Sequence, residues 1–374
     1  MNYVMLKDVC AINMGQSPDS KSYNDTGDGV PFFQGNADFG ARYPVTRKWC
    51  SEPTKMAAPN DILISVRAPI GAMNYARENC CIGRGLAALT PDKSKALPEF
   101  IFWLLKGKNA ELNSKGTGST FKAISRKVLE EIMIPEISLE KQIEFSEILE
   151  RVYGVIQARK EELQKLDELI KARFVELFGD PRSNPFGFEK KMLKDTCKVI
   201  TGNTPSRAIA EYYGDYIEWI KTDNIVSGIL NPTQATESLS EKGMNVGRTV
   251  EKDSILMACI AGSIASIGRV CITDRTVAFN QQINAVVPEQ YNILFLYVLL
   301  QMSKDYLVED INMALKGILS KSKLEEKEFI IPPMDLQEQF SDFVKQVDKS
   351  KVAIKKSLDE TQILFDSLMQ KYFG

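Results

Sequence analysis

The chain contains the same sequence pattern twice. The string MLKDVC at Met5–Cys10 returns as MLKDTC at Met192–Cys197, and FSEILERV at Phe145–Val152 returns as FSDFVKQV at Phe340–Val347. Solenoid and propeller repeats have periods of roughly 20 to 50 residues, and these shifts are several times longer. The repeat is therefore a duplicated domain, and the function is expected to need two copies of one surface.

Each copy consists of a mixed globular part followed by a long helical segment. Both globular parts open with a Gly-x-Ser/Thr-Pro turn, at Gly15–Pro18 and Gly202–Pro205, and both contain short apolar runs that are typical of buried strands, at Ile62–Val66 and Ile255–Ile260. The expected boundaries are 1–137 for the first domain, 138–180 for the first helix, 181–334 for the second domain and 335–374 for the second helix. This pattern predicts an α+β chain with two mixed globular domains separated by two long helices.

In the helical segments most positions at alternating spacings of three and four are apolar, which is the seam of a coiled coil. The polar exceptions, Arg159 and Arg173 in the first segment and Lys351 and Thr361 in the second, never coincide between the copies. The predicted seam residues are Leu149, Val152, Ile156, Leu163, Leu166, Ile170 and Leu177 in the first helix and Val344, Val347, Ile354, Leu358, Phe365 and Leu368 in the second. We expect the helices to pair antiparallel, which would give the internal repeat a pseudo-twofold axis. The alternative is that each helix packs back on its own domain.

The composition excludes several kinds of active site. The chain has no histidine, so it has no Ser-His-Asp or Cys-His catalytic site and no zinc site that uses histidine. The seven cysteines form no C-x-x-C pair, and no phosphate-binding loop is present, so we predict neither catalytic residues nor metal ligands. No apolar run reaches the ~20 residues that span a bilayer, and the start of the sequence lacks the pattern of a signal peptide. A cytoplasmic protein with reduced thiols and no membrane partner is expected.

The charge is unevenly distributed along the chain. The net charge is −2, but residues 1–135 hold 17 basic and 13 acidic side chains, whereas residues 136–180 hold 7 basic and 11 acidic ones. Nonspecific binding to DNA scales with the number of phosphates that a protein neutralises. DNA binding is therefore expected only where partner chains supply additional positive charge.

Polar loops at equivalent places in the two domains are the candidate DNA-binding elements. Arg, Lys, Asn and Gln read base edges, and Ser, Thr and Lys contact phosphates. The candidates are Gln34, Asn36, Arg42, Tyr43, Arg47, Lys48, Arg84, Lys115, Ser119, Thr120 and Lys122 in the first domain and Lys221, Asn224, Asn280, Gln281, Gln282, Lys316, Lys321 and Ser322 in the second. Equivalent loops stay polar but change identity, as expected of two copies that read different sequences. Random substitution in loops that do not contact DNA would give the same pattern.

The two-copy plan resembles the specificity subunit of type I restriction-modification enzymes. The resemblance covers the whole chain and rests on the Gly-x-Ser/Thr-Pro openings, the GRG and NQQ loops before a strand, the Ile-Pro exits and the helices that end in LFGD and YFG. It implies two target recognition domains, each reading one half of a bipartite site in double-stranded DNA, and a helix pair that sets their spacing. It also implies docking of two methyltransferase subunits and, through them, of restriction and translocation subunits. S-adenosylmethionine, ATP and Mg²⁺ would then belong to the partners, and this chain would be non-catalytic with no cofactor of its own.

Two other functions remain open from the sequence. One is a stand-alone enzyme, such as a self-contained methyltransferase, and the other is a scaffold whose globular parts bind only proteins. Methyl transfer by the purified chain would favour the first, and an assembled complex without DNA selectivity would favour the second.

Overall fold

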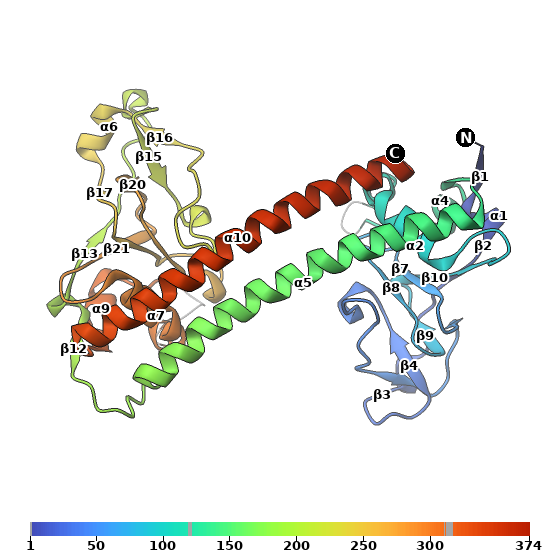
Figure 1. Cartoon of the computed structure of the whole chain (residues 1–374), viewed down its shortest axis with the longest axis horizontal. Coiled ribbons are helices and arrows are strands. Elements are labelled where there is room, and N and C mark those ends of the chain that lie inside the picture. Colours follow the sequence, from blue (N-terminus) through green and yellow to red (C-terminus); the bar gives the residue numbers. More distant parts are fainter. Residues whose placement is uncertain (1, 119–121, 310, 312–316) are drawn as a thin grey trace. The chain divides into compact units, whose positions relative to one another are not determined.

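The structure is a computed structural model that describes residues 2–118, 122–309, 311 and 317–374. It divides into two compact units, Met1–Lys160 with Lys356–Gly374 (unit 1) and Glu161–Lys355 (unit 2). Each unit contains one β-rich domain and one part of each of two 40-residue helices, α5 (Leu139–Phe178) and α10 (Met334–Phe373) (Figure 1). The predicted α+β architecture, with two β-sheet domains linked by a pair of long helices, is confirmed.

The described residues of unit 1 form three sheets. A four-stranded antiparallel sheet has the order β2-β10-β7-β8, a five-stranded sheet has the order β3-β5-β4-β9-β6 with one parallel pair, β4 and β9, and β1 pairs with β11. The strands are β1 (Tyr3–Met5), β2 (Cys10–Met14), β3 (Tyr23–Asn24), β4 (Val30–Phe33), β5 (Trp49–Cys50), β6 (Met56–Ala57), β7 (Ile62–Ser65), β8 (Met73–Tyr75), β9 (Cys80–Ile82), β10 (Leu86–Pro91) and β11 (Met133–Pro135).

Unit 2 repeats this topology strand for strand. The orders are β13-β21-β18-β19, β14-β16-β15-β20-β17 and β12-β22, and β15 pairs parallel with β20. The strands are β12 (Lys190–Met192), β13 (Cys197–Thr201), β14 (Tyr213–Gly214), β15 (Ile217–Ile220), β16 (Ser238–Leu239), β17 (Thr249–Val250), β18 (Ile255–Ala258), β19 (Val270–Ile272), β20 (Val277–Phe279), β21 (Ile283–Pro288) and β22 (Glu328–Ile330). The predicted internal repeat is thus present in the fold as well as in the sequence.

Short helices complete each domain. The shorter α-helices are α1 (Leu6–Val9), α2 (Pro98–Gly107), α3 (Asn109–Ser114), α4 (Arg126–Glu130), α6 (Glu241–Val246), α7 (Ile293–Met302), α8 (Lys304–Val308) and α9 (Lys321–Glu326). Pro98 starts α2 at a position where its missing N–H costs no helical hydrogen bond. Both α2 and α7 are apolar over most of their surface, and each is largely buried against its four-stranded sheet and the long helices.

In unit 1, α5 and the end of α10 pair through aromatic side chains. The ring of Phe145 stacks on Tyr372 with centroids 3.9 Å apart, and the rings of Tyr153 and Phe365 lie 6.0 Å apart. The partner number on α10 falls as the number on α5 rises, so the two segments run antiparallel (Figure 1).

In unit 2, too, the residue number of the partner on α10 falls as the number on α5 rises. The Lys351 ammonium donates to Asp167 at 2.6 Å, and further along α5 the ring of Phe174 meets Phe340 edge-on with centroids 5.5 Å apart. The helices are therefore antiparallel in both units.

The predicted seam residues are all buried or half-buried, but other residues of the helices are buried against the domains. Tyr153 of α5 meets Trp103 of α2, in the domain that precedes α5, with ring centroids 5.3 Å apart. Phe340 of α10 meets Phe295 of α7, in the domain that precedes α10, with ring centroids 6.4 Å apart. The two alternatives for the helices are therefore both realised, because one stripe of each helix faces the other helix and an adjacent stripe faces a domain.

Candidate nucleic-acid interface

In unit 1 three loops that are distant in sequence meet at one edge of the domain. The backbone N–H of Gly15 donates to Leu86 at 2.9 Å, and a Cβ on Gly15 would collide with the carbonyl oxygen of Gly83. The turn therefore needs a glycine at this position in order to lie against the GRG loop, Gly83–Gly85. Its Ser17 hydroxyl accepts from the Arg84 guanidinium at 3.3 Å, which fixes the direction of an exposed cation.

The GRG loop also contacts the turn that follows β4. Gly85 N–H donates to the Gln34 carbonyl at 3.1 Å, and Asp38 accepts from the backbone N–H of Gln34 at 2.7 Å. Asn36 begins the single-turn helix η2 (Asn36–Asp38) directly beyond this contact. The structure thus brings together Gln34, Asn36 and Arg84, with the Gln34 and Arg84 side chains exposed.

Unit 2 builds the same cluster from different side chains. A Cβ on Gly202 would collide with the carbonyl oxygen of Asn280, and Thr204 hydrogen-bonds to the exposed Gln281. The Asn280 N–H donates to the carbonyl of Ile220, directly before Lys221, at 3.0 Å. The same backbone framework therefore presents arginine in one unit and glutamine in the other.

The segment that contains the predicted residues Lys115 and Lys122 joins this edge of unit 1 through the segment between β7 and β8. Val66 N–H donates to Gly85 at 2.9 Å, and Ala68 N–H donates to Lys122 at 3.0 Å, so the exposed Lys122 lies one segment from the GRG loop. Lys115 instead pairs with Glu111 at 2.6 Å. The candidates Ser119 and Thr120 lie outside the described residues.

The equivalent segment of unit 2 is placed in the same way. Cys259 N–H donates to Gln282 at 2.8 Å, and Leu319 N–H donates to Cys259 at 2.9 Å. Lys321 and Ser322 follow at the start of α9, where Lys321 pairs with Glu325 at 3.5 Å. The candidate Lys316 lies outside the described residues.

The basic stretch Arg42–Lys48 of unit 1 is divided between two roles. The Arg47 guanidinium donates to the Ala37 carbonyl at 3.1 Å, so Arg47 and the neighbouring exposed Lys48 lie beside η2. The Arg42 guanidinium instead forms an ion pair with Glu150 of α5 and lies 5.3 Å from the centroid of the Tyr75 ring. Tyr43 is covered by Arg77, which lies 4.9 Å from its ring centroid. Arg42 and Tyr43 thus hold the loop against the domain and helix.

Two predicted amides serve the loops themselves. Asn224 is 7% exposed and donates to the Thr233 hydroxyl at 3.2 Å and the Gln234 carbonyl at 3.1 Å. Asn280 is 6% exposed and hydrogen-bonds to Gln282. Neither amide is available for base contacts in this conformation, so they shape the loops that carry their exposed neighbours.

Sequence reasoning missed Arg207, which follows the Gly-x-Thr-Pro turn of unit 2. Its guanidinium lies 4.4 Å from the Tyr213 ring centroid and donates to Glu237 at 2.7 Å. Lys221 forms an ion pair with the same carboxylate, and these two hydrogen bonds, that of Lys221 first, hold the pKa of Glu237 below its usual range. A phosphate group could replace Glu237 as the partner of both cations.

Sequence reasoning also missed an equivalent pair of cations, Lys55 and Arg248. Both are exposed and directly precede equivalent strands, β6 and β17. The Lys55 carbonyl accepts from Ile82 N–H at 2.9 Å, and the Arg248 carbonyl accepts from Phe279 N–H at 3.3 Å. Each residue therefore lies beside the strand that leads into the GRG or NQQ loop. An ungapped match of residues 55–65 with 248–258 would have revealed them.

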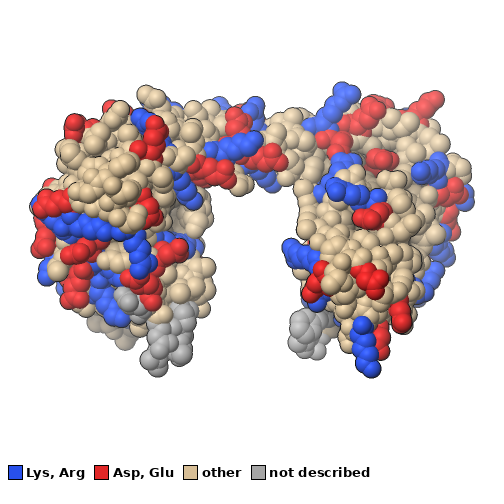
Figure 2. All heavy atoms as spheres, turned by 90° about the horizontal axis from the view of Figure 1, so that it is seen from below, with Lys and Arg blue, Asp and Glu red and all other residues tan. Residues whose placement is uncertain are grey.

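The charged surface is mixed. On the face drawn in Figure 2, Lys and Arg alternate with Asp and Glu over both units and form no uniformly basic field. This agrees with the net charge of −2 and indicates a surface on which individual polar side chains, rather than bulk charge, would give selectivity.

Both domains match the model of one protein family. The profile of the type I restriction modification DNA specificity domain matches residues 1–168 and 185–362. The chain belongs to this family. The two matched segments each contain one complete domain with one of the loop clusters, so both clusters lie within family domains.

Named relatives of the family are similar over part or all of the chain. A putative type I restriction enzyme MjaX specificity subunit from Methanocaldococcus jannaschii is 42% identical over 42% of this chain and 37% of its own length. The MjaIX specificity subunit of the same organism is 24% identical over 98% of this chain and 91% of its own length. The HindI specificity subunit of Haemophilus influenzae is 35% identical over 31% of this chain and 25% of its own length. The chain thus matches about a third of the first relative and nearly all of the second.

Solved structures agree on the fold. The type I restriction-modification S subunit from M. genitalium has a TM-score of 0.62 at 15% identity, with 100% of this chain and 96% of that chain covered. A second structure, which concerns complex assembly and conformational transition of the type I R-M system, has a TM-score of 0.57 at 18% identity, with 100% and 97% covered. At these identities the likeness supports the architecture alone.

The specificity subunits of this family are non-catalytic. Within the described ranges, no group of three or more Cys, Asp or Glu side chains could hold a metal ion.

All seven cysteines are free and buried. Burial raises the pKa of five of these thiols to about 12, those of Cys10, Cys80, Cys197, Cys259 and Cys271. In the part of the chain that the structure describes, no helix is long and apolar enough to cross a bilayer.

Proposed function

We propose that the chain selects a bipartite, asymmetric DNA site, with each domain reading one half. The observation that carries the proposal is the pair of equivalent loop clusters, which share one backbone framework but present different side chains. Arg84 in unit 1 and Gln281 in unit 2 occupy corresponding loops and are both exposed. Arginine favours guanine and glutamine favours adenine in the major groove, so the two halves of the target would differ.

The partners would supply both chemistry and charge. We infer that two methyltransferase subunits dock on the chain and that restriction subunits join through them in the cytoplasm. S-adenosylmethionine, ATP and Mg²⁺ would bind to those subunits. A subunit with a net charge of −2 neutralises few phosphates, so binding to DNA should depend on the cationic surface of its partners.

The first test maps methylated sites in cells that carry the chain and its methyltransferase partner, which returns both half-sites and the gap between them. The Arg84→Gln variant should then lose selectivity by about tenfold or more at one position of one half-site, because one bidentate base contact contributes roughly 1–3 kcal/mol of discrimination. Gln281→Ala should relax only the other half-site.

The matched control is Arg151→Gln, which makes the same charge change at an exposed position of α5. It should leave both half-sites unchanged. If Arg84→Gln behaves like this control, Arg84 does not read DNA. If the partner complex modifies DNA without any gapped consensus, the proposed function itself is wrong.

A further inference from the structure

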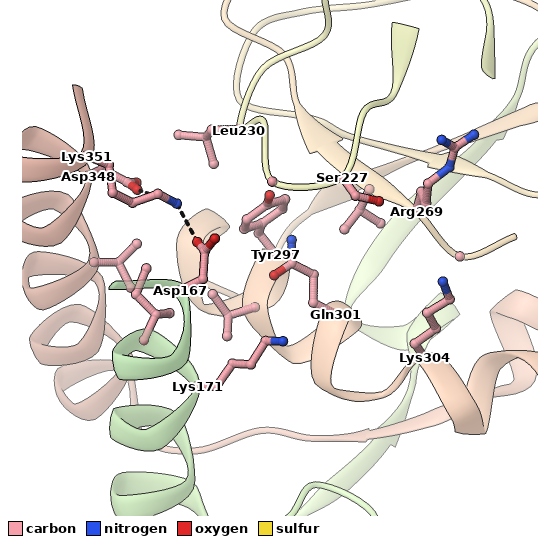
Figure 3. A pocket seen from close by; sticks show the side chains of 16 residues that line it. Asp167, Lys171, Ser227, Leu230, Arg269, Tyr297, Gln301, Lys304, Asp348 and Lys351 are labelled. Atoms are coloured by element: carbon pink, nitrogen blue, oxygen red, sulfur yellow. Dashed lines mark hydrogen bonds and ion pairs between the residues drawn. The ribbon is translucent and has the colours of Figure 1, made fainter. Parts of the chain in front are cut away.

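Unit 2 contains a pocket of about 280 Å³ between the two long helices and the domain. Its walls come from α5, α7 and α10, from the turn that leads into β19 and from the loop that contains Ser227 (Figure 3). None of the predicted DNA-contacting residues lines it. It is therefore separate from the loop cluster of this unit, and its role does not rest on the proposed reading of DNA.

The lining is rich in cations that lack an acidic partner. Lys304 donates to the carbonyl of Ala265 at 2.6 Å, and Arg269 donates to the carbonyls of Ser266 at 3.2 Å and Thr222 at 3.3 Å. For these two residues and Lys171, no carboxylate partner is found among the described residues. Figure 3 shows Gln301 between Lys171 and Lys304.

The two carboxylates of the pocket are engaged by a fourth cation. Lys351 is 13% exposed and lies 2.6 Å from Asp167 and 3.8 Å from Asp348, as the dashed lines in Figure 3 show. Burial raises the pKa of Asp348, and the neighbouring Lys351 opposes only part of this rise. Four cations therefore face two carboxylates, and the pocket has an excess of positive charge.

The duplication supplies a comparison within the same chain. A shift of 195 residues places Asp348 on Tyr153 and Gln301 on Lys106. In unit 1 the Lys106 ammonium lies 3.8 Å from the centroid of the Tyr153 ring, and this contact fills the space that corresponds to the inner wall of the pocket. The inner wall is thus sealed by an aromatic contact in unit 1 and lined by smaller polar side chains in unit 2.

The outer wall differs in charge. The same shift places Lys171 on Asp366 and Lys304 on Asn109, and these two residues of unit 1 line a hollow of about 420 Å³. A hollow beside the long helices is therefore common to both copies of the fold. Its paired lysines occur only in unit 2, so they are not required by the fold.

We propose that the pocket of unit 2 binds a small phosphorylated ligand no larger than a mononucleotide. Lys171 and Lys304 would donate charge-assisted hydrogen bonds to the phosphate, and Gln301 would donate a third. Leu230 and Val270 line the same pocket and would contact the remainder of the ligand. The volume of the pocket admits pyrophosphate or a nucleoside monophosphate and excludes larger cofactors.

Calorimetric titration of the full-length chain with AMP and with pyrophosphate tests this proposal. The double variant Lys171→Gln, Lys304→Gln should weaken binding by about tenfold or more, since the loss of one charge-assisted contact corresponds to roughly 1.4 kcal/mol. The matched control is Lys165→Gln, Lys349→Gln, which removes the same charge from exposed positions of α5 and α10 outside the pocket. The control should bind like the wild type.

A second variant carries the outer wall of unit 1 into unit 2. Lys171→Asp combined with Lys304→Asn should abolish binding, because it replaces both lysines with the residues that unit 1 has at these positions, while the thermal unfolding midpoint stays within a few degrees of the wild type. Duplex DNA added as competitor separates two sources of the phosphate. If AMP binds equally well in the presence of DNA, the pocket takes a free phosphorylated ligand. If DNA displaces AMP, and DNA binding is weakened in the Lys171→Gln, Lys304→Gln variant, the pocket takes a phosphate of the DNA backbone.

The proposal is overturned if neither probe nor DNA binds in a way that depends on Lys171 and Lys304. Equal affinities for wild type, pocket variants and control would show diffuse charge attraction only. These measurements need no methyltransferase and no target sequence, so their failure would leave the proposed selection of DNA untouched.

Discussion

Burial in unit 1 disfavours the charged form of Lys106. Its ammonium lies 3.8 Å from the Tyr153 ring centroid and 5.1 Å from that of Trp103, and burial lowers its pKa to about 8. A lysine in the unfolded chain keeps a pKa of about 10.4, so between these values the unfolded state binds more protons and this residue's contribution to the unfolding free energy rises with pH. Lys106→Met should therefore show a stability advantage over wild type that shrinks from pH 8 to about pH 10.

Urea denaturation of wild type and variant across this pH range measures the effect. Lys93→Met, at an exposed position of the same domain, is the control and should run parallel to the wild type. A parallel curve for Lys106→Met would mean that the buried ammonium does not titrate in this range.

At the scale of elements, the end of α5 is anchored by an aromatic cluster. Phe174 is fully buried, with its ring centroid 5.0 Å from Phe178, 5.6 Å from Phe295 and 5.5 Å from Phe340. Phe174→Ala leaves a cavity where three helices meet and should lower the unfolding free energy by about 3–5 kcal/mol. Chemical denaturation gives the change.

Val175→Ala is the matched control, because Val175 is 45% exposed on the next position of the same helix. Its cost should stay within about 0.5 kcal/mol. Hydrogen exchange in Phe174→Ala should accelerate in the last turns of α5 before it does in the β-sheets. Uniform acceleration throughout the domain would show that the helix end is not a separate anchor.

For the whole molecule, the prediction concerns helix length. If the paired helices set the spacing between half-sites, insertion of one heptad at matching positions of α5 and α10 lengthens each helix by about 10 Å. The methylated site should then tolerate a gap that is longer by about three base pairs, at a rise of 3.4 Å per base pair.

The control inserts the heptad into α5 alone, which breaks the register with α10 and should abolish assembly or selectivity. Methylome mapping of both variants gives the result. An unchanged gap after the matched insertion would exclude the helices as the spacing element.

Much of the architecture was predictable because it depends on periodicity and duplication. The heptad pattern from Leu149 to Leu177 predicts a long helix with a helical partner, and the repeated strings predict two copies of one domain. The Gly-x-Ser/Thr-Pro turns and the GRG and NQQ loops are also recognisable, because they recur in the same order in both copies, but their contact was seen only in the structure. Such features are local or periodic, so they can be recognised without coordinates.

The sequence by itself determined that the chain has two equivalent domains, two long helices and polar loops in matching places. Only the tertiary structure decided which polar side chains are free. The side-chain amides of Asn224 and Asn280 form hydrogen bonds within the loops. The Arg42 guanidinium hydrogen-bonds to Glu150 of α5, 108 residues away in sequence. These outcomes depend on contacts between distant segments, and the energies of burial and pairing that select them have no periodic signature in the sequence.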